Sequence, residues 1–377
     1  MNEILRAIPA LLVVGACLAQ QGLRQRETRY YVIHSDLPAD VLREAELRVD
    51  LMAAEYAART RGFAGAVNRK FPFYLFSEAG DYYNAGGLPG SAGVFDGKRL
   101  MAIAAEGRTD STWHVVQHEG FHQFVDAAIG RNLPIWCNEG LAEYFGSAIF
   151  TGSDYVCGVV PPDRLKRVQR WIEAGHTASV KEMMTKTHDE WNAQLNLVNY
   201  DQAWSMIHFL AHGDGGRYQK AFNKFLKLVS GGEAWEPSWA ASFGYGVKSF
   251  EARWKEYWSS MEAEHSAELY AEAVVARMTN YLARAVSQKQ SFASAGAFFE
   301  AARAGELKAH RQDWLPASLL DEALANAERW GEWALERRGG NQVLVLRSDE
   351  LGEFVGTFQV SGARVRAGSV KVAHEKP

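Results

Sequence analysis

The sequence has few cysteines, no surplus of basic residues and only one long apolar run. Three Cys in 377 residues are too few for a disulfide framework. Lys and Arg number 41 against 45 Asp and Glu, so no basic excess indicates a nucleic-acid partner. Hydrophobic residues make up 47% and charged residues 23%, which is typical of a folded globular chain and excludes a disordered one. The length favours two or three domains.

The apolar run lies at the N-terminus, from Ile4 to Ala19. It is too short to span a bilayer, which needs about 20 apolar residues, and its small-residue end is typical of a secretory signal. The segment Val14 to Cys17 (VGAC) resembles the lipobox of bacterial lipoproteins, which implies an acylated Cys17. Ordinary cleavage after Ala19 and a buried N-terminal helix are the alternatives. We therefore expect residues 1–19 to be a signal or lipoprotein segment.

Export has two consequences for the rest of the chain. The protein would reside in the periplasm, in the cell envelope as a lipoprotein, or outside the cell. Once the segment is removed, Cys137 and Cys157 remain, and an oxidising compartment allows them to pair if their geometry permits it.

Residue patterns along the chain predict an α+β fold. Strands are expected at Arg29–Ser35, Phe71–Phe76 and Lys98–Ala104, and a Gly-rich loop or irregular edge strand at Asn84–Gly97. Helices are expected over residues 38–61, 112–129, 138–148, 163–174, 179–185, 200–211, 217–229, 247–258, 262–285 and 319–338.

The last part of the chain changes its period. Gln342–Val372 alternates apolar and polar residues, which predicts a small antiparallel sheet. A boundary is expected near Ser260–Tyr270, which separates a domain at residues 28–260 from a C-terminal helical region ending in a small β unit at 261–377.

The helix expected over 112–129 contains the sequence HEGFH. His118 and His122 are four residues apart, so their imidazoles lie on one helix face and can ligate a single zinc ion. Glu119 projects from the same turn and can reach a metal-activated water without binding the metal. This is the HExxH arrangement for zinc-assisted hydrolysis.

A second acidic helix follows, with the sequence WCNEGLAEYFG from Trp136. Glu139 and Glu143 are also four residues apart, so both can face the same site. Two His and one carboxylate leave a fourth tetrahedral position open, as catalytic zinc requires. One glutamate can bind the metal while the other orients a ligating His.

HEGFH followed by this NEG helix resembles the gluzincin metallopeptidases, which include thermolysin and the membrane-alanyl-type aminopeptidases. The resemblance implies a zincin-like catalytic domain with a small N-terminal sheet and a mostly helical second lobe, holding one zinc ion per chain. It implies Glu139 as the third ligand and Glu143 as the support of the first zinc His. Arg29 to Trp258 looks most like the peptidase-MA-like domains of bacterial exported proteins. The 16 residues between His122 and Glu139 are a few fewer than in those two families.

Two further segments bear on this resemblance. Val198–Ala203 (VNYDQA) is similar to the VxYxxG segment of the aminopeptidases, which implies that Tyr200 donates a hydrogen bond to the oxyanion. Gly90–Phe95 contains no Glu to hold a free substrate amine, so the sequence does not support aminopeptidase specificity. An edge strand there can still pair with an extended peptide.

The sequence therefore predicts an exported zinc metallopeptidase that acts on peptides or proteins, with Glu119 as general base. Membrane attachment would run through a lipidated N-terminus. The alternative is a non-catalytic cell-surface binding or scaffold lipoprotein that retains the fold and binds partners through residues 261–377. His114, His208 and His212 are expected to be packing or surface residues.

Overall fold

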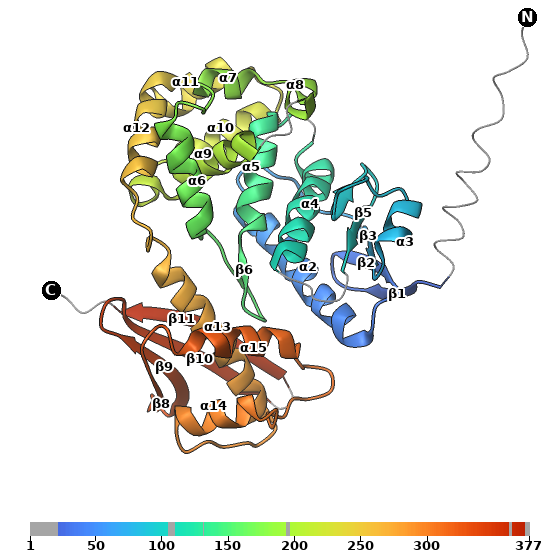
Figure 1. The fold of residues 1–377 in the computed structure, drawn as a ribbon, viewed down its shortest axis with the longest axis vertical. Helices are drawn as coiled ribbons and strands as arrows, with labels where there is room; N and C mark the ends of the chain where they lie inside the picture. The colour runs from blue at the N-terminus through green and yellow to red at the C-terminus, as the bar shows by residue number, and fades with distance from the viewer. Residues whose placement is uncertain (1–21, 105–109, 131, 194–196, 362–363, 374–377) are drawn as a thin grey trace, which may run out of the picture. The chain divides into compact units, whose positions relative to one another are not determined.

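The computed structural model describes residues 22–104, 110–130, 132–193, 197–361 and 364–373 (Figure 1). The chain divides into two compact units. The first holds residues up to 42, 52–147 and 166–260, and the second holds 43–51, 148–165 and 261 onward. Helices α2 (Ala39–Arg59) and α6 (Pro162–Glu173) contribute residues to both. The segment expected at residues 1–19, with Cys17, lies outside the described residues.

A mixed five-stranded sheet opens the first unit, in the order β1-β2-β3-β5-β4. The three central strands are parallel and the two edge strands are antiparallel to their neighbours. Alternate residues of β2 are buried, as a strand packed on one face requires. The strands are β1 (Arg24–Glu27), β2 (Tyr31–Ser35), β3 (Phe71–Phe76), β4 (Gly93–Phe95) and β5 (Leu100–Ile103).

The expected central strands and the irregular edge strand are confirmed. Strand β1 and the short helix α3 (Ala79–Asn84) were not predicted. Pro72 lies inside the central strand β3, where a missing N–H would normally break a ladder. It is tolerated because β5 pairs with β3 only from Phe73 onward.

Three helices build the site on this sheet. α4 (Asp110–Ala128) packs on β4 and β5, α5 (Ile135–Gly146) packs on α4, and α9 (Leu197–Gly216) packs on the far side of α5 (Figure 1). The α5–α9 contact is close because a Cβ on Gly140 would lie only 2.6 Å from the carbonyl oxygen of Ala203. A helix buried between two others holds its side chains in a defined direction.

The remaining helices of the first unit pack on α9 or on one another. Trp254 and Trp258 are fully buried, and both indole N–H groups donate to Ser205 of α9, at 3.1 Å each. The helices are α7 (Val180–Thr185), α8 (His188–Ala193), α10 (Gln219–Ser230), α11 (Trp235–Phe243) and α12 (Val247–Ser260), of which α8 and α11 were not predicted.

The second unit is built on helix α13 and an antiparallel sheet of order β11-β10-β9-β8, which confirms the expected C-terminal sheet. The sheet packs on α13. Its other elements are a hairpin of β6 (Ile149–Phe150) and β7 (Tyr155–Val156), and the helices α13 (Ala267–Ser287), α14 (Ala295–Arg303) and α15 (Ala317–Ala327). The strands are β8 (Glu332–Arg338), β9 (Asn341–Ser348), β10 (Gly352–Ser361) and β11 (Arg364–Ala373).

The helix expected over residues 319–338 is wrong in its second half. α15 ends at Ala327, and Gly331 adopts a φ of +142°, a conformation that an L-residue rarely enters. Residues after Gly331 then pair in register with β9, so the segment becomes strand β8. The hairpin partner β9, which follows β8 after the turn at Gly339 and Gly340, decides the conformation over the local helical pattern.

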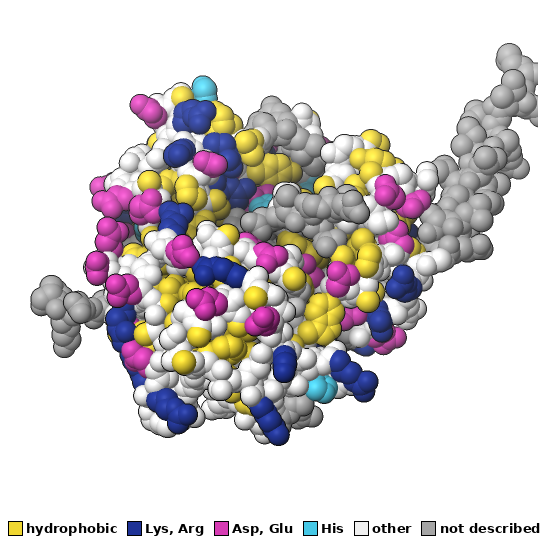
Figure 2. Space-filling view, turned by 60° about the horizontal axis from the view of Figure 1, so that its bottom comes forward, with side chains coloured by type: hydrophobic (Ala, Val, Ile, Leu, Met, Phe, Trp, Pro, Cys, Tyr) yellow, Lys and Arg dark blue, Asp and Glu magenta, His cyan; other side chains and the backbone are white. Residues whose placement is uncertain are grey.

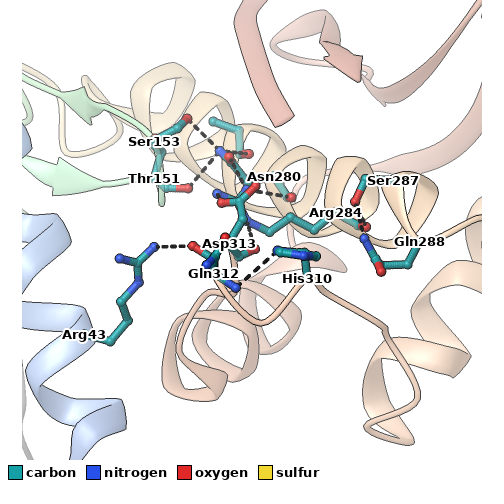
Figure 3. Close-up of polar contacts among 11 residues, drawn as sticks. Arg43, Thr151, Ser153, Asn280, Arg284, Ser287, Gln288, His310, Gln312 and Asp313 are labelled. Carbon is teal, nitrogen blue, oxygen red and sulfur yellow. Dashed lines mark hydrogen bonds and ion pairs between the residues drawn. The ribbon is translucent and has the colours of Figure 1, made fainter. Parts of the chain in front are cut away.

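Buried polar side chains of α13 tie this unit together (Figure 3). Asn280 Nδ2 donates to the carbonyl oxygen of Thr151 at 3.1 Å and to Ser153 Oγ at 2.9 Å. Arg284 donates to the backbone carbonyl of Asp313 at 3.1 Å and to its carboxylate at 2.9 Å. These bonds attach the β6–β7 hairpin and the turn before α15 to one helix.

The surface is mixed in character. The face drawn in Figure 2 carries acidic and basic side chains interspersed, with apolar side chains scattered between them. Within the described ranges, no helix has both the length and the apolar character needed to cross a membrane.

Candidate metal centre

Helix α4 presents three imidazoles on one face. His114, His118 and His122 follow one another at intervals of four residues, which places them in one row along the helix. The ring centroids of His114 and His118 are 6.3 Å apart, and those of His118 and His122 are 4.8 Å apart. The last two rings are nearly perpendicular, with 80° between their planes, so their Nε2 atoms converge.

The converging atoms belong to His118, His122 and Glu139. The two Nε2 atoms are 3.0 Å apart, and Glu139 Oε2 lies 3.4 Å from each of them. With zinc–ligand bonds near 2.0–2.1 Å, a tetrahedral site separates its ligand atoms by about 3.3 Å. The three donors therefore fit one tetrahedral ion, and two imidazoles with one carboxylate are a usual donor set for zinc.

Each of the two converging rings is also held at its second nitrogen. His118 Nδ1 lies 3.1 Å from Glu143 Oε1, and His122 Nδ1 lies 3.1 Å from Asn138 Oδ1. Both partners come from α5, the helix that carries Glu139. A hydrogen bond at Nδ1 fixes the tautomer that leaves the lone pair of Nε2 for a metal.

The electrostatics of the centre favour a cation. Burial opposes a charge on His118, but hydrogen bonds to Glu139 and Glu143 raise its pKa well above the ordinary value. Burial also opposes ionisation of Glu139, but the adjacent His122 and His118 hold the pKa of its carboxyl far below the ordinary value. The carboxylates thus attract a proton into the buried site, and metal binding displaces such a proton.

Glu119 lies one residue after His118 and is half-buried. Its Oε2 accepts a hydrogen bond of 2.8 Å from the backbone N–H of Phe95 on the edge strand β4. The carboxylate is therefore held between the His face of α4 and the open edge of the sheet.

Tyr200 comes from α9 and lies beside the same imidazoles. Its ring centroid is 6.4 Å from that of His118, and Trp191 packs edge-on against it at 5.3 Å. Burial and, next, the charge of Glu139 raise the pKa of Tyr200 to about 12. Its phenol remains protonated near neutral pH and can act as a hydrogen-bond donor.

The structure thus brings together six of the residues singled out in the sequence, and the seventh, Cys17, lies outside the described residues. The six are His118, Glu119, His122, Glu139, Glu143 and Tyr200.

Two polar partners of the centre were missed. His114 was expected to be a packing or surface residue, but its Nε2 lies 3.3 Å from Glu143 Oε2. His114, His118 and Glu143 form a second group of converging donor atoms. The signal was available, because His114 precedes His118 by one turn on the face that Glu143 meets. Asn138 was given no role from the sequence, and its amide oxygen orients His122.

Within the described part of the chain, His208, His212, Cys137 and Cys157 do not belong to this donor set. His208 is buried, with its ring centroid 5.3 Å from that of Trp258, and His212 Nε2 lies 2.9 Å from the hydroxyl of Tyr144. Cys137 and Cys157 are both buried thiols. Burial raises the pKa of the Cys137 thiol well above its ordinary value, so it is a poor metal ligand.

The centre is a buried His-x-x-x-His cluster completed by glutamate, which resembles a zincin motif. Residues 113–231 match the model of a family described as proteins of unknown function, DUF1570. The match includes both His-bearing turns, α5 and Tyr200, and it excludes the strand β4. The search of curated proteins found no match to the chain.

Proposed function

We propose that this chain is a zinc-dependent metallopeptidase of the gluzincin type, with the zincin-like domain at residues 28–260. The observation that carries the proposal is the convergence of His118 Nε2, His122 Nε2 and Glu139 Oε2 within 3.4 Å of one another, with Glu119 on the adjacent position of α4.

Three residues would hold the zinc ion, and two more would orient them. His118, His122 and Glu139 are the ligands, while Glu143 and Asn138 fix the two rings from behind. A bound zinc ion supplies a Lewis acid that polarises the scissile carbonyl and lowers the pKa of water.

Glu119 is the proposed general base. Its carboxylate would accept a proton from the attacking water and pass it to the amine that leaves when the C–N bond breaks. In the structure its Oε2 bonds to the Phe95 N–H, which keeps the group in place without neutralising it.

The edge strand β4 offers a binding surface for an extended peptide. Ala92 O and the Asp96 N–H bond to residues of β5 and its turn. Because strand residues alternate, Gly93 and Phe95 direct their peptide groups to the outer side, where Glu119 lies. A substrate strand pairing with this edge would bring its backbone carbonyl next to Glu119. This supports a peptide rather than a small-molecule substrate.

Tyr200 is the proposed oxyanion donor. A neutral phenol beside the ligands can donate to the oxygen on which negative charge develops as water attacks. Residues 261–377 have no part in this proposed hydrolysis, and the hydrolysis does not depend on where the protein resides. We propose export through the N-terminal segment, with attachment to the envelope if Cys17 is acylated.

The proposal predicts about one zinc per chain and loss of hydrolysis in Glu119→Gln. Elemental analysis should find zinc in both proteins, because Glu119 is not a ligand. Hydrolysis of labelled casein should fall by at least ~10²–10⁴-fold, the usual effect of a lost general base. Glu233→Gln, on an exposed carboxylate of the same unit, is the control.

Two results would overturn the proposal. Absence of zinc after reconstitution at neutral pH would remove the metal centre. Zinc bound without any hydrolysis by the wild-type protein, over a broad set of peptides, would leave the scaffold alternative in its place.

A further inference from the structure

His114 is the one imidazole of the α4 face that the proposed zinc centre does not use. Its Nε2 contacts Glu143 Oε2 at 3.3 Å, while the other oxygen of this carboxylate lies 3.1 Å from His118 Nδ1. Glu143 is therefore bound on both oxygens by imidazoles one turn apart on α4. The carboxylate is buried, whereas the His114 side chain keeps 31% of its surface exposed.

The direction of these hydrogen bonds follows from chemistry. An ionised carboxylate only accepts, so each facing nitrogen must carry a hydrogen. For His118 this is Nδ1–H, which leaves the lone pair of Nε2 for the ion. For His114 it is Nε2–H, which the neutral imidazole supplies as one of its two tautomers. The result is a continuous series of hydrogen bonds from His114 through Glu143 to the proposed ligand His118.

The same geometry argues against His114 as a zinc ligand. The donor atoms fall into two groups, one with His122 and Glu139 and one with His114 and Glu143, and only His118 is common to both. His118 enters the two groups by different nitrogens. An ion in the second group would need the Nδ1 lone pair that the hydrogen bond to Glu143 uses.

The His114 ring is fitted closely against the end of α5. A Cβ placed on Gly146 would lie 2.8 Å from His114 Cε1, so the ring fits only because residue 146 has no side chain. Gln117, three residues further along α4, donates to the carbonyl oxygens of Phe145 and Gly146 at 3.0 and 3.1 Å. This end of α5 is thereby fixed to α4 beside the imidazole of His114.

We propose that His114 is a positioning residue that holds Glu143 in the orientation in which it directs His118 toward the metal. The inference rests on the proposed zinc site. It adds His114 to Glu143 and Asn138, the two residues that orient the proposed ligand rings. It predicts that zinc affinity depends on a hydrogen-bond donor at position 114 and on room for it beside Gly146.

The first test compares two substitutions of similar size. His114→Phe keeps the ring volume but cannot donate, and His114→Gln offers an amide N–H in a comparable place. We expect zinc affinity, measured by chelator competition, to fall ~10-fold in the Phe variant, as happens when a group that orients a metal ligand is lost. The Gln variant should retain it. The thermal midpoint of the zinc-free proteins and the cobalt(II) absorption spectrum separate misfolding from misorientation of the ligands.

The second test displaces the ring without changing it. Gly146→Ala places a methyl group 2.8 Å from His114 Cε1, which is too close for two carbon atoms. The ring must shift, so zinc affinity should fall as it does in His114→Phe. Gly80→Ala, at an exposed helical position with open space around it, is the matched control and should leave affinity unchanged.

Three outcomes would overturn the inference. Equal zinc affinity in wild type, His114→Phe and His114→Gln would show that the contact does not support the ligand. Two zinc ions per wild-type chain, falling to one in His114→Phe, would make His114 a ligand of a second ion. A wild-type protein that binds no zinc would overturn the proposed function together with this inference.

Discussion

Tyr200 is the one proposed catalytic group whose role depends on remaining uncharged. Its pKa is raised to about 12 because burial and the carboxylate of Glu139 both disfavour a phenolate. A raised tyrosine pKa means that the neutral donor persists as the pH rises and is lost only near that value. The hydrogen bond it offers should then be available over the whole range in which a peptidase is assayed.

Tyr200→Phe should keep zinc and lower kcat by on the order of 10²–10³-fold, the effect of removing one oxyanion donor. KM should change little, because the bond forms mainly in the transition state. Steady-state kinetics of the zinc-loaded proteins measures both parameters.

Tyr257→Phe is a matched control, because burial raises the pKa of Tyr257 to about 12 as well. Tyr257 packs on Phe209, with ring centroids 5.1 Å apart. An equal loss of kcat in both variants would contradict a specific role for Tyr200.

Local spacing made several of these residues predictable. His118 and His122 share a face because four residues make about one helical turn, and this requires no tertiary contact. His114 lies in the same row, yet its contact with Glu143 depends on how α5 docks against α4. Spacing alone could not tell a site residue from a surface one.

At the scale of elements, α5 determines the geometry of the centre. It supplies Asn138, Glu139 and Glu143 from one buried helix, and it begins at Ile135 directly after Pro134. The helix expected over residues 138–148 thus begins three residues earlier. Pro134 ends the connection between α4 and α5. The first turns of the α5 helix then place Asn138, Glu139 and Glu143 against the His face of α4.

Gly140→Ala should test this packing. The new Cβ would lie 2.6 Å from the carbonyl oxygen of Ala203 and 2.6 Å from the Ile207 side chain, both on α9. The carbonyl oxygen belongs to the backbone, so it cannot rotate away. We expect the free energy of unfolding to fall by ~1–3 kcal/mol, as overpacked cores do, despite the helix propensity that alanine gains. Urea unfolding measures it.

Gly80→Ala provides the comparison for that experiment, because nothing lies within 4 Å of its added Cβ. Its free energy of unfolding should change by no more than the small gain in helix propensity from glycine to alanine. If the two variants changed the free energy of unfolding equally, the result would contradict the close approach of α5 and α9.

At the scale of the whole molecule, the chain divides into two compact units. The second unit contains the buried guanidinium of Arg284, which bonds to Asp313 and to Asn280. Such a cation is stabilised only while its partners are present, because burial of an unpaired charge is costly.

Arg284→Met should therefore destabilise the protein without affecting the metal. Removing the cation leaves the Asp313 carboxylate partly buried without its partner, and we expect a loss of about 3–5 kcal/mol in the free energy of unfolding. Zinc affinity of the folded protein should stay at the wild-type value, because the metal donors all belong to the first unit. Calorimetry and chelator competition separate the two effects, and a parallel loss of zinc would contradict this independence.

The N-terminal segment gives a prediction about location. If Cys17 is acylated, the protein should sediment with membranes, and Cys17→Ser should release it into the soluble fraction. Fractionation after expression in a bacterium with lipoprotein processing provides the measurement. Equal partitioning of the two forms would favour simple secretion.

The sequence by itself determined the α+β character, the central strands of the first sheet and the row of imidazoles on α4, because period and composition are local properties of the chain. It did not predict strand β8, since pairing with β9 overrides the helical pattern before it. Nor could it bring together Glu139, the Phe95 N–H, Tyr200 and His114, which come from four separate elements. Their proximity arises from packing of α4 on the sheet, of α5 on α4 and of α9 on α5. Only the tertiary structure decides such contacts, because they depend on the close fit of helix surfaces far apart in sequence.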